Sequence, residues 1–296
     1  MSKIKKVIIP VAGLGTRMLP ATKAIPKEML PVLNKPIIQY IVEEAIYAGF
    51  KEIILVTHSS KSSIENHFDK SFELEATLDK RVKRSLLKEI RAISKLNISM
   101  QSIRQGEAKG LGHAILCANR LVNKEPFAVI LPDMLISNDN GNAGDSLKEM
   151  RLNYEKYENS CVLFGRAKKA DIPKYGIAKI KKNSKLPGLG LVEKIIEKPP
   201  INEAPSNLYV AGRYIFNNDF FRYLSKVKPD KSNEIQLTDA IADYIKDGKK
   251  VNAFPLEGDI FDCGDNAEYI LANLEFAMKD PSMKTKIKKY LKTRLF

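Results

Sequence analysis

Short apolar runs alternate with helical repeats along the first half of the chain. Four runs rich in β-branched residues predict buried strands, at 6–11, 52–57, 98–103 and 127–131. Apolar residues at helical spacing predict helices between them, at 36–48, 62–68, 79–96 and 112–121, the third strongly basic. Strands that alternate with helices in this way favour a mostly parallel sheet covered by helices on both faces.

The second half alternates less regularly and has more polar loops. Strands are predicted at 161–166, 176–180, 190–196 and 208–216, and helices at 218–224, 236–246 and 266–278. The last 18 residues have the composition of a basic helical tail. Since there is no internal repeat and no low-complexity linker, we expect one large α/β domain over 1–264. Residues 265–296 form a C-terminal helical segment that is a candidate for oligomerisation.

The composition is that of a globular protein, with 44% hydrophobic and 28% charged residues. No apolar run approaches the roughly 20 residues that a membrane-spanning helix needs. The apolar run at 7–12 is interrupted by Pro10 and lacks a signal-peptide cleavage site. The three cysteines are widely spaced and odd in number, so no disulfide framework is expected. We therefore expect a cytoplasmic protein without a membrane partner.

The net charge of +14 admits three interpretations. Residues 279–296 hold seven basic side chains and one acidic, so much of the excess lies in the tail. The remaining excess could serve nucleic acid, a small and highly anionic substrate, or no ligand at all, as a lysine-rich solvated surface. The chain has no zinc-finger spacing and no RNA-recognition motif. Charge alone does not decide between these alternatives.

A glycine loop, Gly13–Arg17 (GLGTR), follows the first predicted strand. Because glycine has no Cβ, the backbone N–H groups of such a loop can approach an anion closely. Two phosphate-binding templates fail here. Met18 stands where the dinucleotide fingerprint needs glycine, and the P-loop pattern does not occur. A G-x-G pattern after a strand is, by itself, a weak sign of a phosphate site.

The longer run Gly13–Pro31, GLGTRMLPATKAIPKEMLP, resembles the signature loop of the sugar nucleotidyltransferases. Further blocks resemble the uridylyltransferase branch of that family and occur in the expected order: IILVTHSSKSSIE at 53–65, QGEAKGLGHA at 105–114, VILPD at 129–133, EKIIEKP at 193–199, AGRY at 211–214, EIQLTDAI at 234–241 and FDCG at 261–264. The main regions without such similarity are 139–145 and 181–189.

The resemblance implies a Rossmann-like three-layer α/β nucleotidyltransferase fold and a Mg²⁺-dependent reaction. In this branch an oxygen of glucose 1-phosphate attacks the α-phosphate of UTP in line, giving UDP-glucose and pyrophosphate without a covalent enzyme intermediate. The two substrates together bring about six negative charges, so such a site needs cations more than a general base. No specific nucleic-acid partner is implied, and the amphipathic C-terminal helices favour a homodimer or homotetramer.

In this family the signature loop wraps the triphosphate, so the resemblance assigns Arg17 and Lys27 to phosphate binding and catalysis. Arginine can hold phosphate oxygens bidentately, whereas lysine acts as a mobile point charge. Gln105 and Gly110 resemble the loop that reads uracil, where a side-chain amide can pair with the edge of the base. The remaining nucleotide contacts are expected from Ala12, Gly13, Gly15 and Thr16.

Two aspartates are the expected metal ligands. Asp133 follows the strand predicted at 127–131, at the sheet edge where open α/β sheets bind ligands. By resemblance it holds Mg²⁺, a hard cation that suits one or two carboxylates plus phosphates. A turn cap after Pro132 is the alternative for this residue. Asp262, in the FDCG block, is the expected second carboxylate, with a purely structural aspartate as the alternative.

The sugar side is expected from the second half of the chain. The resemblance assigns the sugar hydroxyls to Glu197, and it assigns the sugar-side phosphate to Lys198 as a catalytic cation. Neighbours on a strand point to opposite faces, so these two side chains should diverge, with a surface salt bridge as the alternative. Gly176 and Gly212 are expected to line the sugar pocket. Arg213 stays open between a substrate contact and a structural ion pair.

Three other functions remain open on the sequence alone. A thymidylyltransferase or another nucleotidyltransferase would differ only in its base or its sugar. A basic nucleic-acid-binding protein would need a binding motif that this chain lacks. A glycosyltransferase with a nucleotide-sugar fold would carry a D-x-D metal motif after a strand, whereas this strand is followed by LPDML at 131–135.

Overall fold

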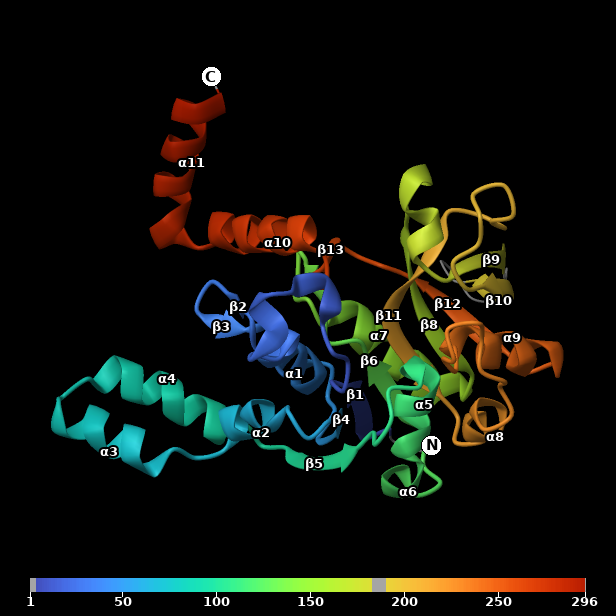
Figure 1. The fold of residues 1–296 in the computed structure, drawn as a ribbon, viewed down its shortest axis with the longest axis horizontal. Coiled ribbons are helices and arrows are strands. Elements are labelled where there is room, and N and C mark those ends of the chain that lie inside the picture. Colours follow the sequence, from blue (N-terminus) through green and yellow to red (C-terminus); the bar gives the residue numbers. More distant parts are fainter. Residues whose placement is uncertain (1–3, 183–189, 296) are drawn as a thin grey trace.

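The computed structural model describes residues 4–182 and 190–295, which fold around a central nine-stranded sheet (Figure 1). The strands of the sheet are β1 Lys6–Pro10, β4 Glu52–Thr57, β5 Ser99–Arg104, β6 Phe127–Ile130, β8 Ser160–Arg166, β9 Ile177–Lys182, β10 Gly190–Ile196, β11 Leu208–Phe216 and β12 Val251–Pro255. They lie in the order β5-β4-β1-β6-β11-β8-β12-β10-β9. Two short ribbons lie outside the sheet, β2 Pro31–Val32 with β3 Lys35–Pro36, and β7 Met134–Ser137 with β13 Asp259–Asp262.

The strands from the first half of the chain pair in parallel. Hydrogen bonds join β5 to β4, β4 to β1 and β1 to β6 in parallel register, as the predicted alternation of strands and helices requires. β11 is antiparallel to both β6 and β8, and β10 is antiparallel to β12 and β9, so the second half is mixed. The carboxyl ends of β1 and β6 therefore open at one edge of the sheet, where open α/β sheets place ligands.

Helices cover both faces of the sheet. They are α1 Ile37–Tyr47, α2 Ser62–Phe68, α5 Gly110–Cys117, α6 Asn119–Val122, α7 Asp145–Tyr157, α8 Phe220–Leu224 and α9 Leu237–Lys246. Because successive side chains of a strand point to opposite faces, alternate residues pack into two hydrophobic cores. Val7 and Ile9 of β1 lie in the core with α1 and α7, whereas Ile8 lies in the core with α5, α8 and α9. The three-layer α/β architecture implied by the sequence is confirmed.

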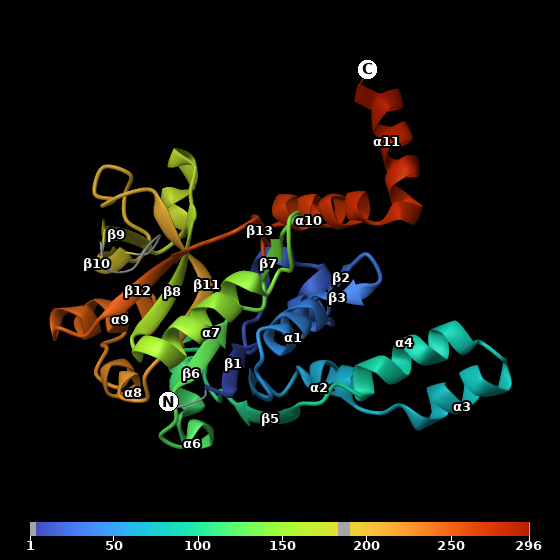
Figure 2. The same ribbon diagram turned by 180° about the vertical axis from the view of Figure 1, so that it is seen from behind.

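A helical hairpin occupies the region where the sequence predicts one helix over 79–96. α3 spans Phe72–Lys80 and α4 spans Arg84–Ser94, and Val82 in the turn between them has φ 54. Arg91 Nε lies 3.0 Å from Glu75 Oε2, which ties the two helices together. The single-helix prediction is wrong because a left-handed residue interrupts the helix and turns the chain back. The hairpin extends away from the sheet, with α2 at its base (Figures 1 and 2).

Helix α7, strand β12 and the β7–β13 ribbon have no counterpart among the sequence predictions. The buried positions of α7, Leu147, Met150 and Tyr154, stand three and four residues apart in otherwise polar sequence. β7, β12 and β13 contain four or five residues each, too few for a periodic pattern to emerge. Residues 183–189, within a region that lacks family similarity, lie outside the described residues.

Two helices end the chain, as the sequence predicts. α10, Asn266–Lys279, buries Ala272 and Ala277, and the side chain of Asp265 caps its first turn. α11, Pro281–Leu295, packs against α10 and projects away from the rest of the molecule (Figure 2). Within 4–182 and 190–295, no helix combines the length and the apolar character needed to cross a membrane. All three cysteines are free thiols.

Candidate active site

A cavity of about 460 Å³ opens beside the carboxyl end of β6, between segments from both halves of the chain. Its polar lining comes from Arg17, Asp133, Lys174, Glu197, Lys198, Gln236, Thr238 and Asp262. Leu111, Leu131, Val210 and Tyr214 supply apolar walls. Five of the side chains predicted from the sequence for catalysis, metal or sugar binding thus lie around one space, although they are scattered along the chain.

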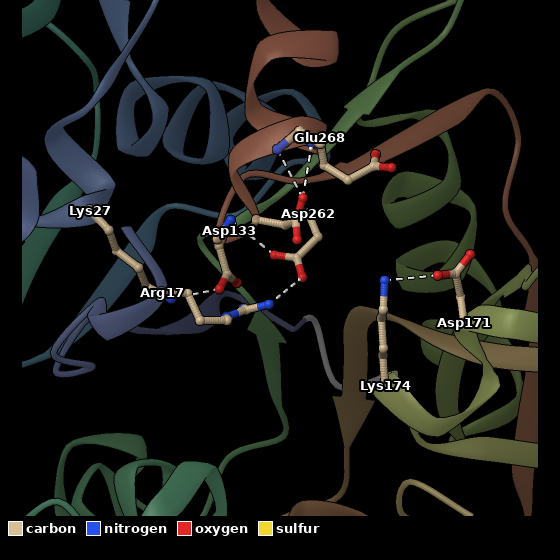
Figure 3. Close-up of polar contacts among 10 residues, drawn as sticks. Arg17, Lys27, Asp133, Asp171, Lys174, Asp262 and Glu268 are labelled. Atoms are coloured by element: carbon tan, nitrogen blue, oxygen red, sulfur yellow. Dashed lines mark hydrogen bonds and ion pairs between the residues drawn. The ribbon is translucent and has the colours of Figure 1, made fainter. Parts of the chain in front are cut away.

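Two carboxylates of this lining, Asp133 and Asp262, each pair with a cation from a distant segment (Figure 3). Lys27 Nζ lies 2.6 Å from Asp133 Oδ2, and Arg17 Nη1 lies 3.0 Å from Asp262 Oδ2. The antiparallel pairing of β7 with β13 brings the two aspartates together. The backbone N–H of Cys263 donates to the carbonyl oxygen of Asp133 at 2.8 Å. The ribbon that the sequence did not predict is therefore the element that assembles the charged cluster.

The Lys27–Asp133 pair favours its charged form. Burial alone would raise the pKa of Asp133, but the adjacent Lys27 ammonium, with a backbone hydrogen bond and Arg17, outweighs burial and holds that pKa below its usual range. Burial likewise opposes the charge on Lys27, and Asp133 together with Glu28 outweighs it, so the pKa of Lys27 is raised. Both groups are charged at neutral pH. Lys27 is therefore a fixed positive charge and not a proton acceptor.

Lys27 is held more firmly than a mobile charge on a loop. Its side chain is only 16% exposed. The residue begins a short 3₁₀ turn, Lys27–Met29, and the next residue, Glu28, accepts a hydrogen bond from Lys61 Nζ at 2.8 Å. Glu28 and Lys61 are both buried, so this ion pair anchors the turn that carries Lys27. The sequence analysis did not foresee this anchor.

The glycine loop lies against the same lysine. Gly15 adopts φ 67, a left-handed conformation that favours glycine, and Thr22 Oγ1 donates to the Gly15 carbonyl oxygen at 2.7 Å. A Cβ at Gly13 would lie 3.9 Å from Lys27 Cε. Ala12 is buried at the end of β1, and the loop continues into a 3₁₀ turn at Thr16–Met18. The predicted nucleotide-binding loop is thus folded next to Lys27.

The two residues predicted to read the base contact each other. Gln105 is buried, and its Nε2 donates to the Gly110 carbonyl oxygen at 3.2 Å. Gly110 has φ 84, and a Cβ there would lie 2.8 Å from Glu234 Cβ, so packing against this segment requires glycine. Of the described residues, those that line the cavity do not include Gln105 or Gly110. The two residues predicted to read the base therefore form a group separate from the cavity lining that includes Glu197 and Lys198.

Glu197 and Gly176, both predicted to bind the sugar, lie together in the lining of the cavity. Thr238 Oγ1 donates to Glu197 Oε2 at 2.9 Å. Burial raises the pKa of Glu197, although the Thr238 hydroxyl and a nearby lysine oppose the shift. A Cβ at Gly176 would lie 3.1 Å from Glu197 Oε2, so glycine keeps this carboxylate accessible. Gly212, by contrast, is enclosed by Leu131 and has φ 77. The left-handed backbone of β11 at this position is what favours glycine there.

Glu197 and Lys198 do not diverge as neighbours in a strand would. β10 ends at Ile196, and Lys198 adopts φ 42 in the left-handed region. Lys198 Nζ lies 3.6 Å from Glu197 Oε1, and both residues line the cavity. The predicted divergence is wrong because the strand, and with it the alternation of side chains, has already ended. A left-handed residue other than glycine is a strained conformation of the kind that clusters at functional sites.

The sequence analysis missed four polar or aromatic lining residues, Lys174, Tyr175, Gln236 and Thr238. Lys174 Nζ pairs with Asp171 Oδ1 at 2.8 Å across the cavity from the aspartate cluster (Figure 3). Lys174 and Tyr175 directly precede the predicted sugar-pocket glycine. Gln236 and Thr238 lie inside the EIQLTDAI block at 234–241 that contributed to the family resemblance. For Gln236 and Thr238, position within that block was the available signal.

Arg213 is a structural residue. It is completely buried, and its Nε and Nη2 donate to the two carboxylate oxygens of Glu44 at 2.9 and 2.5 Å. Glu44 belongs to α1, so the bidentate pair ties α1 to β11 through the core. This observation resolves the choice that the sequence left open between a substrate contact and an ion pair.

Asp133 and Asp262 fit a hard divalent cation. Among the described residues, no three His, Cys, Asp or Glu side chains gather into a metal-binding group. Mg²⁺ does not require one, because it keeps several waters and binds through one or two carboxylates plus substrate phosphates. Two carboxylates in the lining of one cavity, Asp133 and Asp262, match that requirement.

Comparison with known proteins agrees with this geometry. The family model described as nucleotidyl transferase matches residues 6–279. A UTP–glucose-1-phosphate uridylyltransferase from Escherichia coli is 47% identical over 99% of this chain and 97% of its own length. A UTP-bound UGPase from Acinetobacter baumannii superposes with a TM-score of 0.88 at 41% identity, covering 97% of this chain and 98% of the other. A UDP-glucose pyrophosphorylase complexed with UDP-glucose superposes with a TM-score of 0.83 at 42% identity, covering 94% of this chain and 100% of the other.

Proposed function

This chain belongs to the nucleotidyl transferase family, and on that premise we propose that it transfers the uridylyl group of UTP to glucose 1-phosphate. The products are UDP-glucose and pyrophosphate. The observation that carries the proposal is the meeting of Arg17, Lys27, Asp133 and Asp262 at one end of a cavity whose other polar groups suit a sugar phosphate. Relatives named for this reaction match the chain over nearly its whole length.

The reaction exchanges one phosphoanhydride bond for another. An oxygen of the sugar phosphate forms a bond to the α-phosphorus of UTP, and the bond to the β-phosphate oxygen breaks. Pyrophosphate leaves with that electron pair. The attacking oxygen belongs to a phosphate whose second pKa is about 6, so it is ionised at neutral pH and needs no general base. Such transfers depend mainly on positioning and on stabilising charge.

Lys27 and Arg17 supply positive charge to the triphosphate. Lys27 is charged and anchored before substrate arrives, so it stabilises developing charge without reorganisation. The Arg17 side chain is 59% exposed, and its free N–H groups can meet phosphate oxygens bidentately. Lys198 faces the cavity on the sugar side and is assigned to the phosphate of glucose 1-phosphate.

Asp133 and Asp262 are the residues that would hold Mg²⁺. The ion, when bound, neutralises phosphate charge and polarises phosphoryl oxygens. Because Lys27 keeps the pKa of Asp133 low, that carboxylate is ionised at neutral pH and needs no proton release to act as a ligand.

The two substrates are recognised at opposite ends of the site. We assign the uracil edge to the Gln105 amide, with Ala12 and Gly110 supplying backbone near the base. Glu197 accepts hydrogen bonds from sugar hydroxyls, and Thr238 holds its carboxylate in place. Gly176 leaves the space that a side chain would take from the hexose.

Pyrophosphate release with four nucleoside triphosphates and several sugar 1-phosphates tests the proposal. UTP with glucose 1-phosphate should give the highest kcat/KM in the presence of Mg²⁺, and EDTA should abolish turnover. A preference for dTTP over UTP by more than about tenfold, equivalent to roughly 1.4 kcal/mol, would assign the enzyme to thymidylyl transfer instead.

Replacing Glu197 with glutamine should raise KM for glucose 1-phosphate by about tenfold or more, since a hydrogen bond to a charged group contributes roughly 1.5–3 kcal/mol. KM for UTP should change little. Burial raises the pKa of Glu197, so the parent enzyme loses the accepting carboxylate at a higher pH than an exposed glutamate would. Its KM for glucose 1-phosphate should therefore rise as pH falls.

The glutamine variant is also the control for that pH profile. Both enzymes experience the same ionisation of the substrate phosphate, so the ratio of their KM values isolates the titration of Glu197. A ratio that stays constant from neutral to acidic pH, or equal changes in KM for UTP, would remove Glu197 from the sugar site.

We further propose that residues 1–264 form the catalytic unit and that 265–296 mediate self-association. α11 is basic, and Met283 and Tyr290 on it are exposed, so an apolar contact surface remains available to a second copy of the chain. Light scattering of the full chain distinguishes a monomer from a homodimer or homotetramer.

The free thiols suit the reducing cytoplasm, where we place the enzyme.

A further inference from the structure

The buried amide of Gln105 has one allowed orientation. Its Nε2 lies 3.2 Å from the Gly110 carbonyl oxygen and 3.0 Å from His113 Nδ1. A carbonyl oxygen can only accept, so the amide atom facing Gly110 must be the NH₂ group. Turning the amide over would bring two acceptor oxygens into contact at a buried position, which costs the full desolvation of both.

This orientation also fixes the proton on His113. The NH₂ group of Gln105 can only donate, so His113 Nδ1 must be the unprotonated, accepting nitrogen, and the proton of the neutral ring lies on Nε2. Nε2 faces Cys117 Sγ at 4.0 Å, one turn further along α5. Burial raises the pKa of the Cys117 thiol, so the group opposite Nε2 is uncharged. Gln105 alone therefore sets which nitrogen of His113 carries the proton, and Cys117 lies beside the protonated nitrogen without determining it.

The contacts with Gly110 and His113 leave one atom of the Gln105 amide for a ligand. The NH₂ group is shared between Gly110 and His113, and within 4–182 and 190–295 the oxygen of Gln105 accepts no hydrogen bond. The only group that this side chain can offer to a substrate is therefore an acceptor.

We propose that His113 is a specificity-determining positioning residue, which selects uracil over cytosine by locking the Gln105 amide with its oxygen towards the base. Uracil carries an N–H donor at N3, whereas cytosine has an acceptor nitrogen there. A fixed acceptor attracts the first and repels the second. The inference rests on the proposed uridylyl transfer and on the assignment of Gln105 to the base. Without His113, a single contact to Gly110 remains to orient the amide.

The test compares kcat/KM for UTP and for CTP in four enzymes. His113→Phe keeps a ring but removes the acceptor, and it should lower the UTP-to-CTP ratio by about tenfold, the value of one ordinary hydrogen bond. His113→Asn places an acceptor oxygen at the position of Nδ1 and should restore most of the ratio. Cys117→Ala, the matched control on the same helix, should leave the ratio at the parent value. KM for glucose 1-phosphate should be unchanged in all four.

A second measurement does not depend on folding of the variants. The chain has three histidines, so ¹⁵N-histidine labelling of the parent enzyme gives a spectrum simple enough to assign the His113 tautomer. A proton on Nε2 of His113 supports the proposed hydrogen bond from the Gln105 amide, and a proton on Nδ1 overturns the inference. A folded His113→Phe enzyme whose ratio stays within twofold of the parent also overturns the inference. A parent enzyme that does not prefer UTP to CTP contradicts the proposed function itself, which separates the two failures.

Discussion

Replacing Lys27 with alanine is expected to lower kcat about a hundredfold or more, the usual effect of removing one preorganised charge contact from a transition state. Charge grows on the leaving pyrophosphate as its bond to the α-phosphorus breaks, so a fixed cation contributes most at that point. Lys27 is anchored through Asp133 and through the buried Glu28–Lys61 pair. KM for UTP should rise far less, because in the proposed site backbone donors and Arg17 also hold the ground-state triphosphate. Steady-state pyrophosphate release measures both constants.

Lys23→Ala is the matched control, since Lys23 lies in the same loop with an exposed side chain. It should keep nearly the parent kcat. The Lys27 variant leaves Asp133 without the charge that offsets its burial, so its melting temperature should fall by several degrees while the fold persists. A folded Lys27→Ala enzyme that retains more than half the parent kcat would show that this loop only positions substrate.

Replacing Arg213 with alanine should lower the free energy of unfolding by about 3–5 kcal/mol, as expected for breaking a buried ion pair. The change strands Glu44 in the core, where it is 4% exposed and has lost both hydrogen bonds from the guanidinium. Urea denaturation followed by circular dichroism measures the loss. Substrate KM values of the folded fraction should stay near those of the parent, because Arg213 is enclosed in the core.

Two further variants test whether the loss comes from the stranded charge. Arg213→Met combined with Glu44→Leu removes both charges and should recover most of the stability, since apolar replacement of a buried pair is often neutral. Lys249→Ala breaks an exposed pair with Asp219 and should change stability by about 0–1 kcal/mol. Equal losses for Arg213→Ala and Lys249→Ala would mean that the buried pair does not hold α1 to β11.

The sequence predicted the elements whose pattern is local and repeated. β4 and α2 occupy the predicted residues, because a buried parallel strand is a continuous apolar run and a packed helix repeats every three or four residues. The α3–α4 turn depends on one left-handed residue, Val82, which no periodicity announces. The β7–β13 ribbon joins two short segments through long-range pairing, which a local pattern cannot reveal.

The predicted site shows the same division. Family resemblance named the side chains that would meet the substrates, and five of them line one cavity. It did not name their supports, Lys61 behind Glu28, Thr238 behind Glu197 and His113 behind Gln105. All three supports lie inside the family blocks, but the side chain that each one contacts is set by the folded chain, so the blocks alone do not indicate the pairs.

The ribbon also determines when activity appears during synthesis. Arg17 and Asp262 are 245 residues apart, and the second of them reaches the site only when β13 pairs with β7. The parallel strands β5, β4, β1 and β6 come from the first half of the chain and leave the ribosome long before β13 does. A nascent or proteolytically shortened chain that lacks β13 contains the strands β1, β4, β5 and β6 and the whole glycine loop, yet it has only one of the two carboxylates proposed to hold the metal. On the proposed metal site, turnover thus requires the chain as far as β13, and it reports the pairing of β13 with β7.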